Sequence, residues 1–328
     1  MKPAVTVLGL LMAGMPVYAE GPLPTLSGAL AIGGKGGWDY VTADASTHLL
    51  YVSHESRMHV IDPAARKVVA EIPDTPGVHG IALAPEFNRG FITCGKDNSL
   101  VVIDLKTSRT VARLAQIGTK PDAVTFDPFS KRVFVMNNGG DNLTVVDAQT
   151  QQVIGSIPVG GAPESAQSDL KGRLFVNVED KNQVKVIDTQ SLKVLATWSL
   201  APHATPTGMA IDVENHRLFV GCRSKQLVVL DLGTGAIVAT VPIGAGVDAC
   251  AFDPATRHVF ASCKDGTVTV LHADSADTYA MAGILRTEPG SKTMTLDVST
   301  HKLYVPAAGA AGTPGDAKAG FQLLEYNQ

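Results

Sequence analysis

An aromatic residue inside a short strand-forming triplet recurs along the chain at nearly regular intervals, and this repeat constrains the fold more than any other feature. The aromatic residues are separated by 40, 43, 41, 44, 41 and 44 residues and lie at Tyr51, Phe91, Phe134, Phe175, Phe219, Phe260 and Tyr304. Self-similarity at a fixed period of about 20–50 residues indicates an array of one supersecondary unit. The sequence therefore predicts seven copies of a single unit.

Each copy has the pattern of four short strands. About ten residues after the aromatic residue, copies one to five have a β-branched run that ends in an acid, such as Val60-Ile61-Asp62, whereas the run of the sixth copy ends in His272. A polar turn then leads into a further alternating segment, such as 67–72. Because a four-stranded sheet of this size cannot bury both faces alone, the copies must pack on one another, and radial packing of such sheets is a β-propeller. The predicted fold is all-β: a seven-bladed β-propeller of four-stranded antiparallel blades.

The two ends of the chain complement each other. The last copy supplies two strands within 291–306 and a third at 321–325, but no fourth strand follows. A strand-like segment at 26–32 belongs to no copy. We expect this N-terminal strand to complete the last blade and close the ring, which removes a sheet edge open to aggregation. The segment 307–320, rich in Ala, Gly and Pro, is predicted to be a loop within that blade.

The first residues predict export. Lys2, an apolar run over 4–15, Pro16 and the small residue Ala19 are typical of a cleavable signal peptide. The apolar run is too short to span a bilayer. We therefore expect residues 1–19 to be removed and residues 20–328 to form a single propeller domain, periplasmic or secreted and without a transmembrane segment. The chain has 27 Lys and Arg against 31 Asp and Glu, a formal net charge of −4, which makes nucleic acid an unfavourable partner.

Polar residues of different kinds occupy equivalent positions in the seven copies. One set opens the innermost strand, 12 residues before the aromatic residue in six copies and 11 in the fourth, and the other set follows the aromatic triplet. Both sets fall at the same end of the blades, so we expect them at one mouth of the axial channel. Packing alone favours similar residues at similar positions, so their variety predicts a binding site. The candidate ligand-binding residues are Trp38, Asp39, His54, His79, Asp122, Asn137, Glu164, Glu179, Arg223, Asp248, Lys264 and Lys292.

Four metal-ligand or acid–base side chains are expected to meet in the first two copies. Equal spacing places Asp39 opposite His54 and His79 opposite Cys94 across their hairpins. These residue types suit a metal site or acid–base chemistry. The interpretation we favour is structural: the histidines and Asp39 hydrogen-bond the loops and Cys94 packs in the core, because no tight metal-binding motif is present.

The chain has four cysteines, which export would allow to pair. Cys94, Cys222 and Cys263 share one position in different copies, so they are expected to lie too far apart for a disulfide. Cys222 and Cys250 are the one pair that the predicted contact between copies five and six would bring together.

Several motifs resemble one family of propellers. They are the segments 51–54 (Tyr-Val-Ser-His) and 134–137 (Phe-Val-Met-Asn), the Val-Ile-Asp strands, and the Ile-Pro-Val-Gly ending at 157–160. Together they resemble the YVTN-repeat, YncE-like family of bacterial seven-bladed propellers over essentially the whole chain after residue 19. The resemblance implies the fold but no single activity, because such propellers look similar to quinoprotein dehydrogenase subunits, lactonases and DNA-associated proteins alike. Segments 36–40, 74–80 and 176–180 resemble an exported subgroup without an assigned reaction.

Two classes of function remain open. We favour a non-catalytic binding or interaction protein that holds a small polar ligand, or a loop of a periplasmic partner protein, at the channel mouth. The acids fall on copies one, three, four and six and the basic residues on copies five to seven, so a ligand with separated charges fits better than a simple anion. The alternative is an enzyme, either a metal-dependent, lactonase-like hydrolase or a quinoprotein-like redox-associated propeller. No motif identifies a cofactor.

Overall fold

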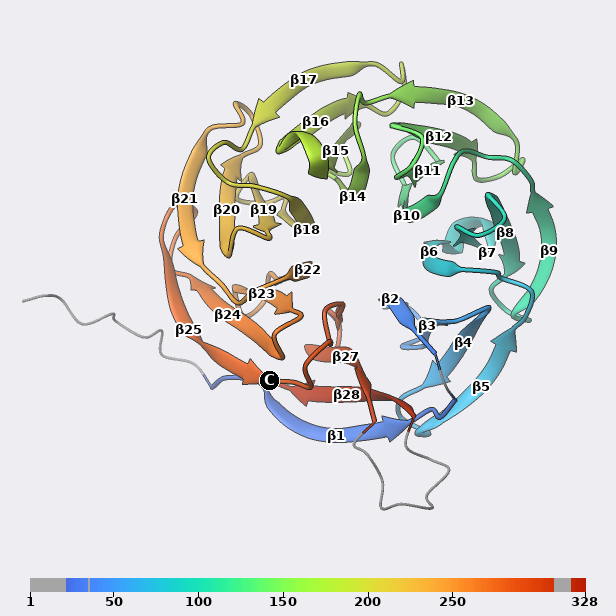
Figure 1. Ribbon diagram of the computed structural model, residues 1–328, viewed down its shortest axis with the longest axis horizontal. Coiled ribbons are helices and arrows are strands. Elements are labelled where there is room, and N and C mark those ends of the chain that lie inside the picture. Colours follow the sequence, from blue (N-terminus) through green and yellow to red (C-terminus); the bar gives the residue numbers. More distant parts are fainter. Residues whose placement is uncertain (1–21, 35, 310–319) are drawn as a thin grey trace, which may run out of the picture.

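The computed structural model describes residues 22–34, 36–309 and 320–328. The strands in these ranges form seven four-stranded antiparallel sheets arranged in a ring (Figure 1). The described helical turns are η1 (Pro85–Phe87) and η2 (Glu179–Lys181). No helix among the described residues has the length and apolar character needed to cross a bilayer. The prediction of an all-β, seven-bladed propeller is confirmed.

In blades one to six the strands run outward from the channel in chain order. Blades one to three consist of β2 (Trp38–Ala43), β3 (Leu50–His54), β4 (Arg57–Asp62) and β5 (Lys67–Ile72); β6 (Val78–Ala84), β7 (Arg89–Cys94), β8 (Ser99–Asp104) and β9 (Arg109–Leu114); and β10 (Pro121–Asp127), β11 (Arg132–Asn137), β12 (Asn142–Asp147) and β13 (Val153–Pro158). Blades four to six consist of β14 (Pro163–Ser168), β15 (Arg173–Val178), β16 (Gln183–Asp188) and β17 (Val194–Ser199); β18 (Pro206–Asp212), β19 (Arg217–Cys222), β20 (Gln226–Asp231) and β21 (Ile237–Pro242); and β22 (Val247–Asp253), β23 (His258–Cys263), β24 (Thr267–Ala273) and β25 (Tyr279–Arg286).

The last blade joins the two ends of the chain. Its strands are β26 (Thr295–Asp297), β27 (Lys302–Ala308), β28 (Phe321–Asn327) and, outermost, β1 (Thr25–Ala31). Thr25 pairs with Asn327 and Ala31 with Gln322. Closure of the ring by an N-terminal strand is therefore confirmed. The expected signal peptide at 1–19 and most of the loop expected at 307–320 lie outside the described residues.

The recurring aromatic residues explain why the copies pack radially. Tyr51, Phe91, Phe134, Phe175, Phe219 and Phe260 are among the largest fully buried side chains. Phe175 of blade four, for example, packs in one cluster with Leu218 and Val220 of blade five. Burial of such a side chain contributes roughly 1.5–3 kcal/mol. Each aromatic residue thus fixes its blade to the next.

The acid that ends the third strand of blades one to five has a local structural role. The Asp147 carboxylate accepts hydrogen bonds from the backbone N–H and the hydroxyl of Thr150, at 2.7 and 2.9 Å. Asp231 and Thr234 repeat this arrangement, with both distances at 2.9 Å. These are side-chain-stabilised turns, for which Asp and Thr are favoured. The repeated acids therefore stabilise turns.

Close packing of the innermost strands gives a first prediction. A Cβ atom at Gly208 in β18 would lie 2.8 Å from the carbonyl carbon of Ala249 and 2.9 Å from the backbone nitrogen of Cys250. Because backbone cannot move aside easily, we expect Gly208→Ala to destabilise the protein by about 1–3 kcal/mol, measured as a lower urea midpoint. Gly37→Ala is the control, since no atom lies within 4 Å of its added Cβ. Equal midpoints for the two variants would contradict this packing.

Candidate functional site

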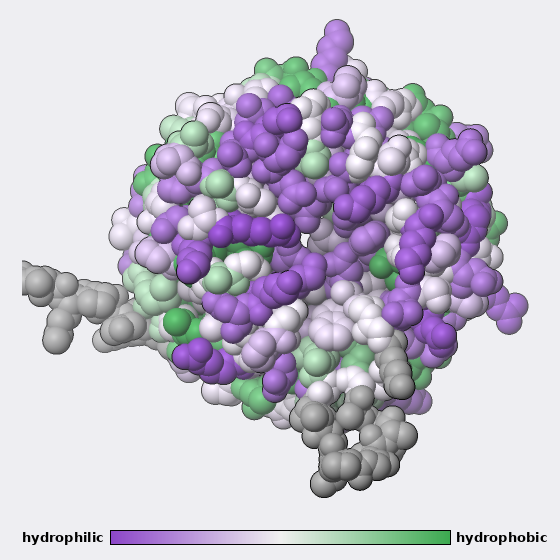
Figure 2. Space-filling view, in the orientation of Figure 1, coloured by the Kyte–Doolittle hydropathy of each residue, from purple (hydrophilic) through white to green (hydrophobic). Residues whose placement is uncertain are grey.

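The innermost strands begin with side chains that meet at one end of the channel. Ion pairs between neighbouring blades show this directly. His79 of blade two pairs with residues of blades one and three, and Lys292 of blade seven pairs with residues of blades one and six. We call the following set the mouth ring: Asp39, His79, Asp122, Glu164, Asp248 and Lys292. Hydrophilic side chains also gather around the centre of the face seen in Figure 2. The mouth ring contains six of the twelve residues that the sequence singled out, and two more, Arg223 and Glu179, lie beside it.

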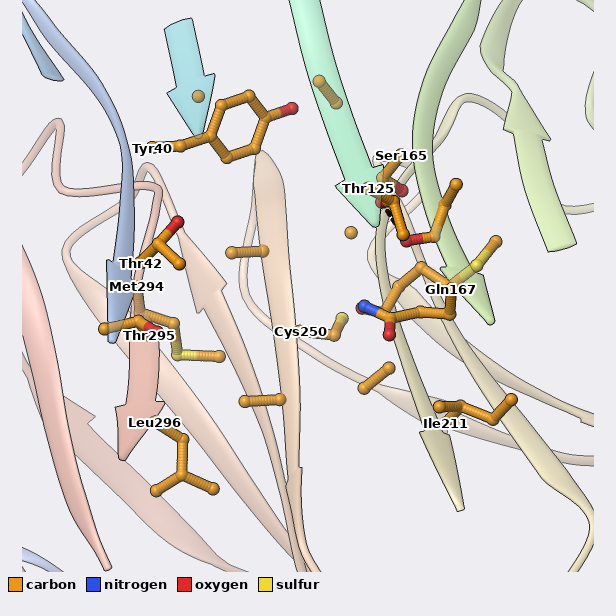
Figure 3. A pocket seen from close by; sticks show the side chains of 18 of the residues that line it. Tyr40, Thr42, Thr125, Ser165, Gln167, Ile211, Cys250, Met294, Thr295 and Leu296 are labelled. Atoms are coloured by element: carbon orange, nitrogen blue, oxygen red, sulfur yellow. Dashed lines mark hydrogen bonds between the residues drawn. The ribbon is translucent and has the colours of Figure 1, made fainter. Parts of the chain in front are cut away.

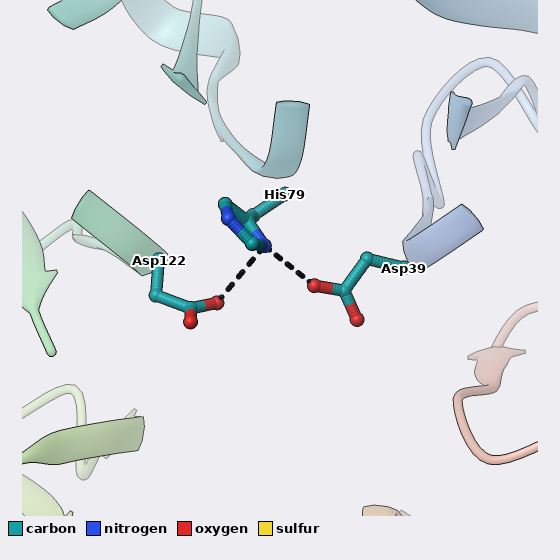
Figure 4. A group of neighbouring side chains, drawn as sticks. All are labelled: Asp39, His79 and Asp122. Atoms are coloured by element: carbon teal, nitrogen blue, oxygen red, sulfur yellow. Dashed lines mark hydrogen bonds and ion pairs between the residues drawn. The ribbon is translucent and has the colours of Figure 1, made fainter. Parts of the chain in front are cut away.

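His79 lies between two carboxylates from the neighbouring blades (Figure 4). Its Nδ1 is 2.7 Å from Oδ2 of Asp39 and 3.4 Å from Oδ1 of Asp122. Burial would lower the pKa of His79, but the Asp39 hydrogen bond and both carboxylate charges outweigh it and raise the pKa. Burial would raise the pKa of Asp39, yet His79 and Lys292 hold it below its ordinary value. Burial raises the pKa of Asp122 to about 6.

Asp248 gathers the basic side chains of the mouth. The Lys292 ammonium lies 2.5 Å from one of its oxygens, and the Arg223 guanidinium lies 2.9 Å from the other. Lys292 also contacts Oδ1 of Asp39 at 3.3 Å, and Arg223 approaches Glu179 at 3.9 Å. Despite burial, which would lower it, the carboxylates raise the pKa of Lys292 above its ordinary value. Lys292 and Arg223 are therefore both charged, and both are directed toward Asp248.

Glu164 is the carboxyl group of the mouth ring whose negative charge is least balanced by nearby positive charges. Its Oε2 accepts a 3.1 Å hydrogen bond from the side-chain amide of Asn138, which also donates to Glu179 at 3.3 Å. Among the described residues it forms no ion pair. Burial, followed by the charges of Asp122, Glu179 and Asp248, raises the pKa of Glu164 to about 9, and Arg223 offsets this only in part.

A cavity of about 390 Å³ continues from the mouth ring along the channel axis. Figure 3 shows the side chains of Tyr40, Thr125, Gln167 and Cys250 directed toward this shared space. Burial and the nearby carboxylates, Glu164 first, raise the pKa of Tyr40 well above its ordinary value. The tyrosine hydroxyl is therefore neutral. Asp248 is the one charged residue among the described residues that line the cavity.

The predicted pairing across the first hairpins was wrong by one residue. Trp38, not Asp39, lies opposite His54, and Val78, not His79, lies opposite Cys94. The register then shifts along each hairpin, which is the mark of a β-bulge. Because successive side chains point to opposite faces, a shift of one residue separates groups that equal spacing would place together. The expected cluster of Asp39, His54, His79 and Cys94 is therefore not formed.

The second set of candidate residues has several different surroundings. Nδ1 of His54 lies 3.2 Å from Nε2 of His59. Trp38 stacks on Phe321, with the ring centroids 5.1 Å apart. Cys94 is fully buried in a core cluster, and burial raises its pKa to about 11.

Two further candidates also lie outside the mouth ring. Asn137 is fully buried and donates to Asn142 and to the Thr144 hydroxyl. Lys264 is exposed and forms no ion pair with a described residue. Asn137 and Cys94 thus have structural roles. Cys222 and Cys250, like the other two cysteines, are free.

The candidate set omitted two residues of the site. Asn138 bridges two carboxyl groups, whereas its neighbour Asn137, which was singled out, is directed into the blade. Tyr40 follows Asp39 and lines the cavity. Strict alternation along a strand would have placed Tyr40 away from the channel, so only the register shift in blade one could have indicated its position.

Comparison with known proteins gives a consistent but distant similarity. No family model matches the chain. The chain is 22% identical over 194 residues to two proteins named "Uncharacterized protein YncE", from Salmonella typhi and Salmonella typhimurium. The match covers 57% of this chain and 54% of each relative, so the chain spans about half the length of the curated relatives it matches. With its seven four-stranded blades, the chain is a β-propeller similar to YncE.

Proposed function

We propose that this propeller is a binding protein that holds, without transforming it, a small ligand whose positively charged group enters the mouth ring. The mouth ring and its neighbours Glu179 and Arg223 contain five carboxyl groups and two permanently charged basic groups. Both basic groups are already engaged by Asp248. A simple anion would therefore meet uncompensated carboxyl groups, whereas a cation would relieve their repulsion.

The observation that carries this proposal is the environment of Glu164. It is a largely buried carboxyl group with an amide donor but no cationic partner among the described residues. Burying a carboxylate without a partner is unfavourable, so the free protein keeps this group protonated. An ammonium or guanidinium group at this point would supply the missing charge. A negatively charged group of the same ligand would be directed toward Arg223, whose side chain is 45% exposed.

The cavity supports a ligand of limited size. Its volume of about 390 Å³ lies near the lower end of the range, about 300–1,000 Å³, that is usual for small-molecule sites. Ile81, Met209 and Leu296 supply apolar wall, and Thr125 and Gln167 supply hydrogen-bonding groups. Burial raises the pKa of the Cys250 thiol above its ordinary value, which disfavours a thiolate nucleophile in the wall. We place this binding in the periplasm on the signal-peptide pattern of residues 1–19 alone.

The test uses a matched set of small probes: primary amines, guanidines, zwitterionic amino acids and carboxylates of similar size. We expect probes with a positive group to bind and the simple carboxylates to bind more weakly, measured by ligand-observed NMR and calorimetry. Glu164→Gln should weaken binding of the amines about tenfold, because a charge-assisted contact contributes roughly 1.5–3 kcal/mol. Glu214→Gln is the control, since Glu214 is exposed in the turn after β18. Preference for carboxylates, or amine binding unchanged by Glu164→Gln, would overturn the proposal.

A further inference from the structure

We propose that Asp39, His79 and Asp122 form a binding site for one divalent first-row transition-metal ion on one side of the mouth ring. This site goes beyond the proposed binding of a cationic ligand and does not require it. The three residues open the innermost strands of three consecutive blades, so the ring itself sets their separation. Figure 4 shows one carboxylate oxygen of Asp39 and one of Asp122 directed toward the same ring nitrogen of His79.

The geometry suits a metal ion. One nitrogen of His79 and one oxygen from each carboxyl group all lie within 4.8 Å of one another. The nitrogen is 2.7 Å from the Asp39 oxygen and 3.4 Å from the Asp122 oxygen. Ligands bound about 2.0–2.2 Å from zinc in a tetrahedron lie roughly 3.4 Å apart, so small side-chain rotations would accommodate the ion.

The donor set indicates the class of metal. An imidazole nitrogen favours zinc, copper, iron or nickel, whereas magnesium and calcium prefer sites made only of oxygen ligands. Three protein ligands leave at least one coordination position free, which is the arrangement of metal sites that engage another molecule and not of closed structural sites. The side chain of His79 is 24% exposed and that of Asp122 is 12% exposed, so the free position is accessible from the channel.

Two neighbouring residues have opposite effects on metal binding: Gly95 favours it and Lys292 opposes it. A Cβ atom at Gly95 would lie 2.7 Å from Nε2 of His79, so a glycine here leaves room for the imidazole to direct Nδ1 toward the carboxylates. Lys292 contacts the Asp39 oxygen that His79 does not contact, so one carboxylate can serve both the ammonium and the ion. The ammonium charge nevertheless repels the metal. These neighbours provide variants that change the site without removing a ligand atom.

The competing interpretation is a structural cluster in which protonated His79 donates a hydrogen bond to Asp39 and forms an ion pair with Asp122. The experiment uses protein without an affinity tag, stripped with a chelator and titrated with zinc by calorimetry and with cobalt by visible absorption. We expect one ion per chain. His79→Asn and Asp122→Asn should each weaken binding by about tenfold or more. His272→Asn is the matched control, because His272 forms a 2.7 Å pair with Asp274 outside the mouth ring.

Two further variants separate a metal site from a structural cluster. Gly95→Ala should weaken zinc binding because the added methyl group displaces His79. Lys292→Met should strengthen it several-fold, because it removes a repelling charge and keeps all three ligands. Absence of stoichiometric zinc binding, or equal binding by His79→Asn and the unsubstituted protein, would overturn the proposal. The amine probes are measured on chelator-treated protein, so the two proposals are tested independently. If zinc does not bind, the effect of Glu164→Gln on amine binding can still be measured. If the amines do not bind, the zinc titration can still be measured.

Discussion

Deletion of residues 22–32 should lower the midpoint of thermal unfolding by about 5–8 °C. The deletion removes β1, the outermost strand of the last blade, and with it a ladder that pairs Thr25–Ala31 with β28. It also removes Leu30 and Ile32, which pack on the core cluster formed with Leu50 and Phe321. A loss of roughly 3–5 kcal/mol corresponds to this shift for a protein of this size. Circular dichroism measures the change.

Complementation in trans provides the control for this deletion. A synthetic peptide of sequence 25–32 should raise the midpoint of the truncated protein in a saturable manner, because it restores the missing strand of an otherwise complete ring. A peptide of the same composition in scrambled order should have no effect. We also expect the truncated protein to aggregate at high concentration, since β28 becomes an exposed edge. An unchanged midpoint after deletion would show that the ring does not depend on this closure.

Glu164→Gln should stabilise the unliganded protein at alkaline pH. Burial, followed by the neighbouring acids, raises the folded-state pKa of Glu164 to about 9, against an ordinary value near 4.5. Between these values the folded protein holds a proton that the unfolded chain has released, so the stability of the unsubstituted protein falls as the pH rises. Glutamine does not titrate and escapes this loss. Each pKa unit corresponds to about 1.4 kcal/mol, so we expect a gain of at least about 1.4 kcal/mol at pH about 9.

The pH series supplies its own reference for this variant. The stability difference between Glu164→Gln and the unsubstituted protein should shrink toward zero as the pH falls to about 4–5, where both folded and unfolded states keep the proton. Urea unfolding at several pH values measures it. Glu214→Gln, in an exposed turn, should show no such trend. A pH-independent difference would mean that Glu164 titrates normally and would remove the main support for a cation-binding mouth.

The fold was predictable because the sequence pattern of one blade recurs seven times along the chain. Aromatic residues such as Phe91 and Phe134, spaced by 43 residues, mark the packing between neighbouring blades. This packing depends on the spacing of hydrophobic residues and is not lost when a strand contains a β-bulge. The orphan segment at 26–32 had only one vacant position to occupy, next to 321–325. Repetition thus made even the long-range pairing of the two ends accessible from sequence.

The site was predictable only in part, because it depends on single-residue register. Residues that open the innermost strands, such as Asp122 and Asp248, meet as expected, since this position is the same in every blade. Residues after the second strand were placed correctly only in part. Glu179 and Arg223 reach the mouth ring, but Cys94 does not join His79, because the bulge after Val78 moves the two out of register. Backbone irregularities of this kind leave no mark in the hydrophobic pattern. The same irregularity in blade one explains why Tyr40 was missed.

The pairing of β1 with β28 has a consequence for how the protein folds during its synthesis. Thr25 pairs with Asn327, so the ring cannot close until all residues from 25 to 327 have been synthesised. Contacts between residues so distant in sequence form slowly. Until then the outer edges of both end strands stay open to neighbouring chains. Nascent molecules therefore pass through an unclosed stage, during which a chaperone that shields strand edges would be of most use.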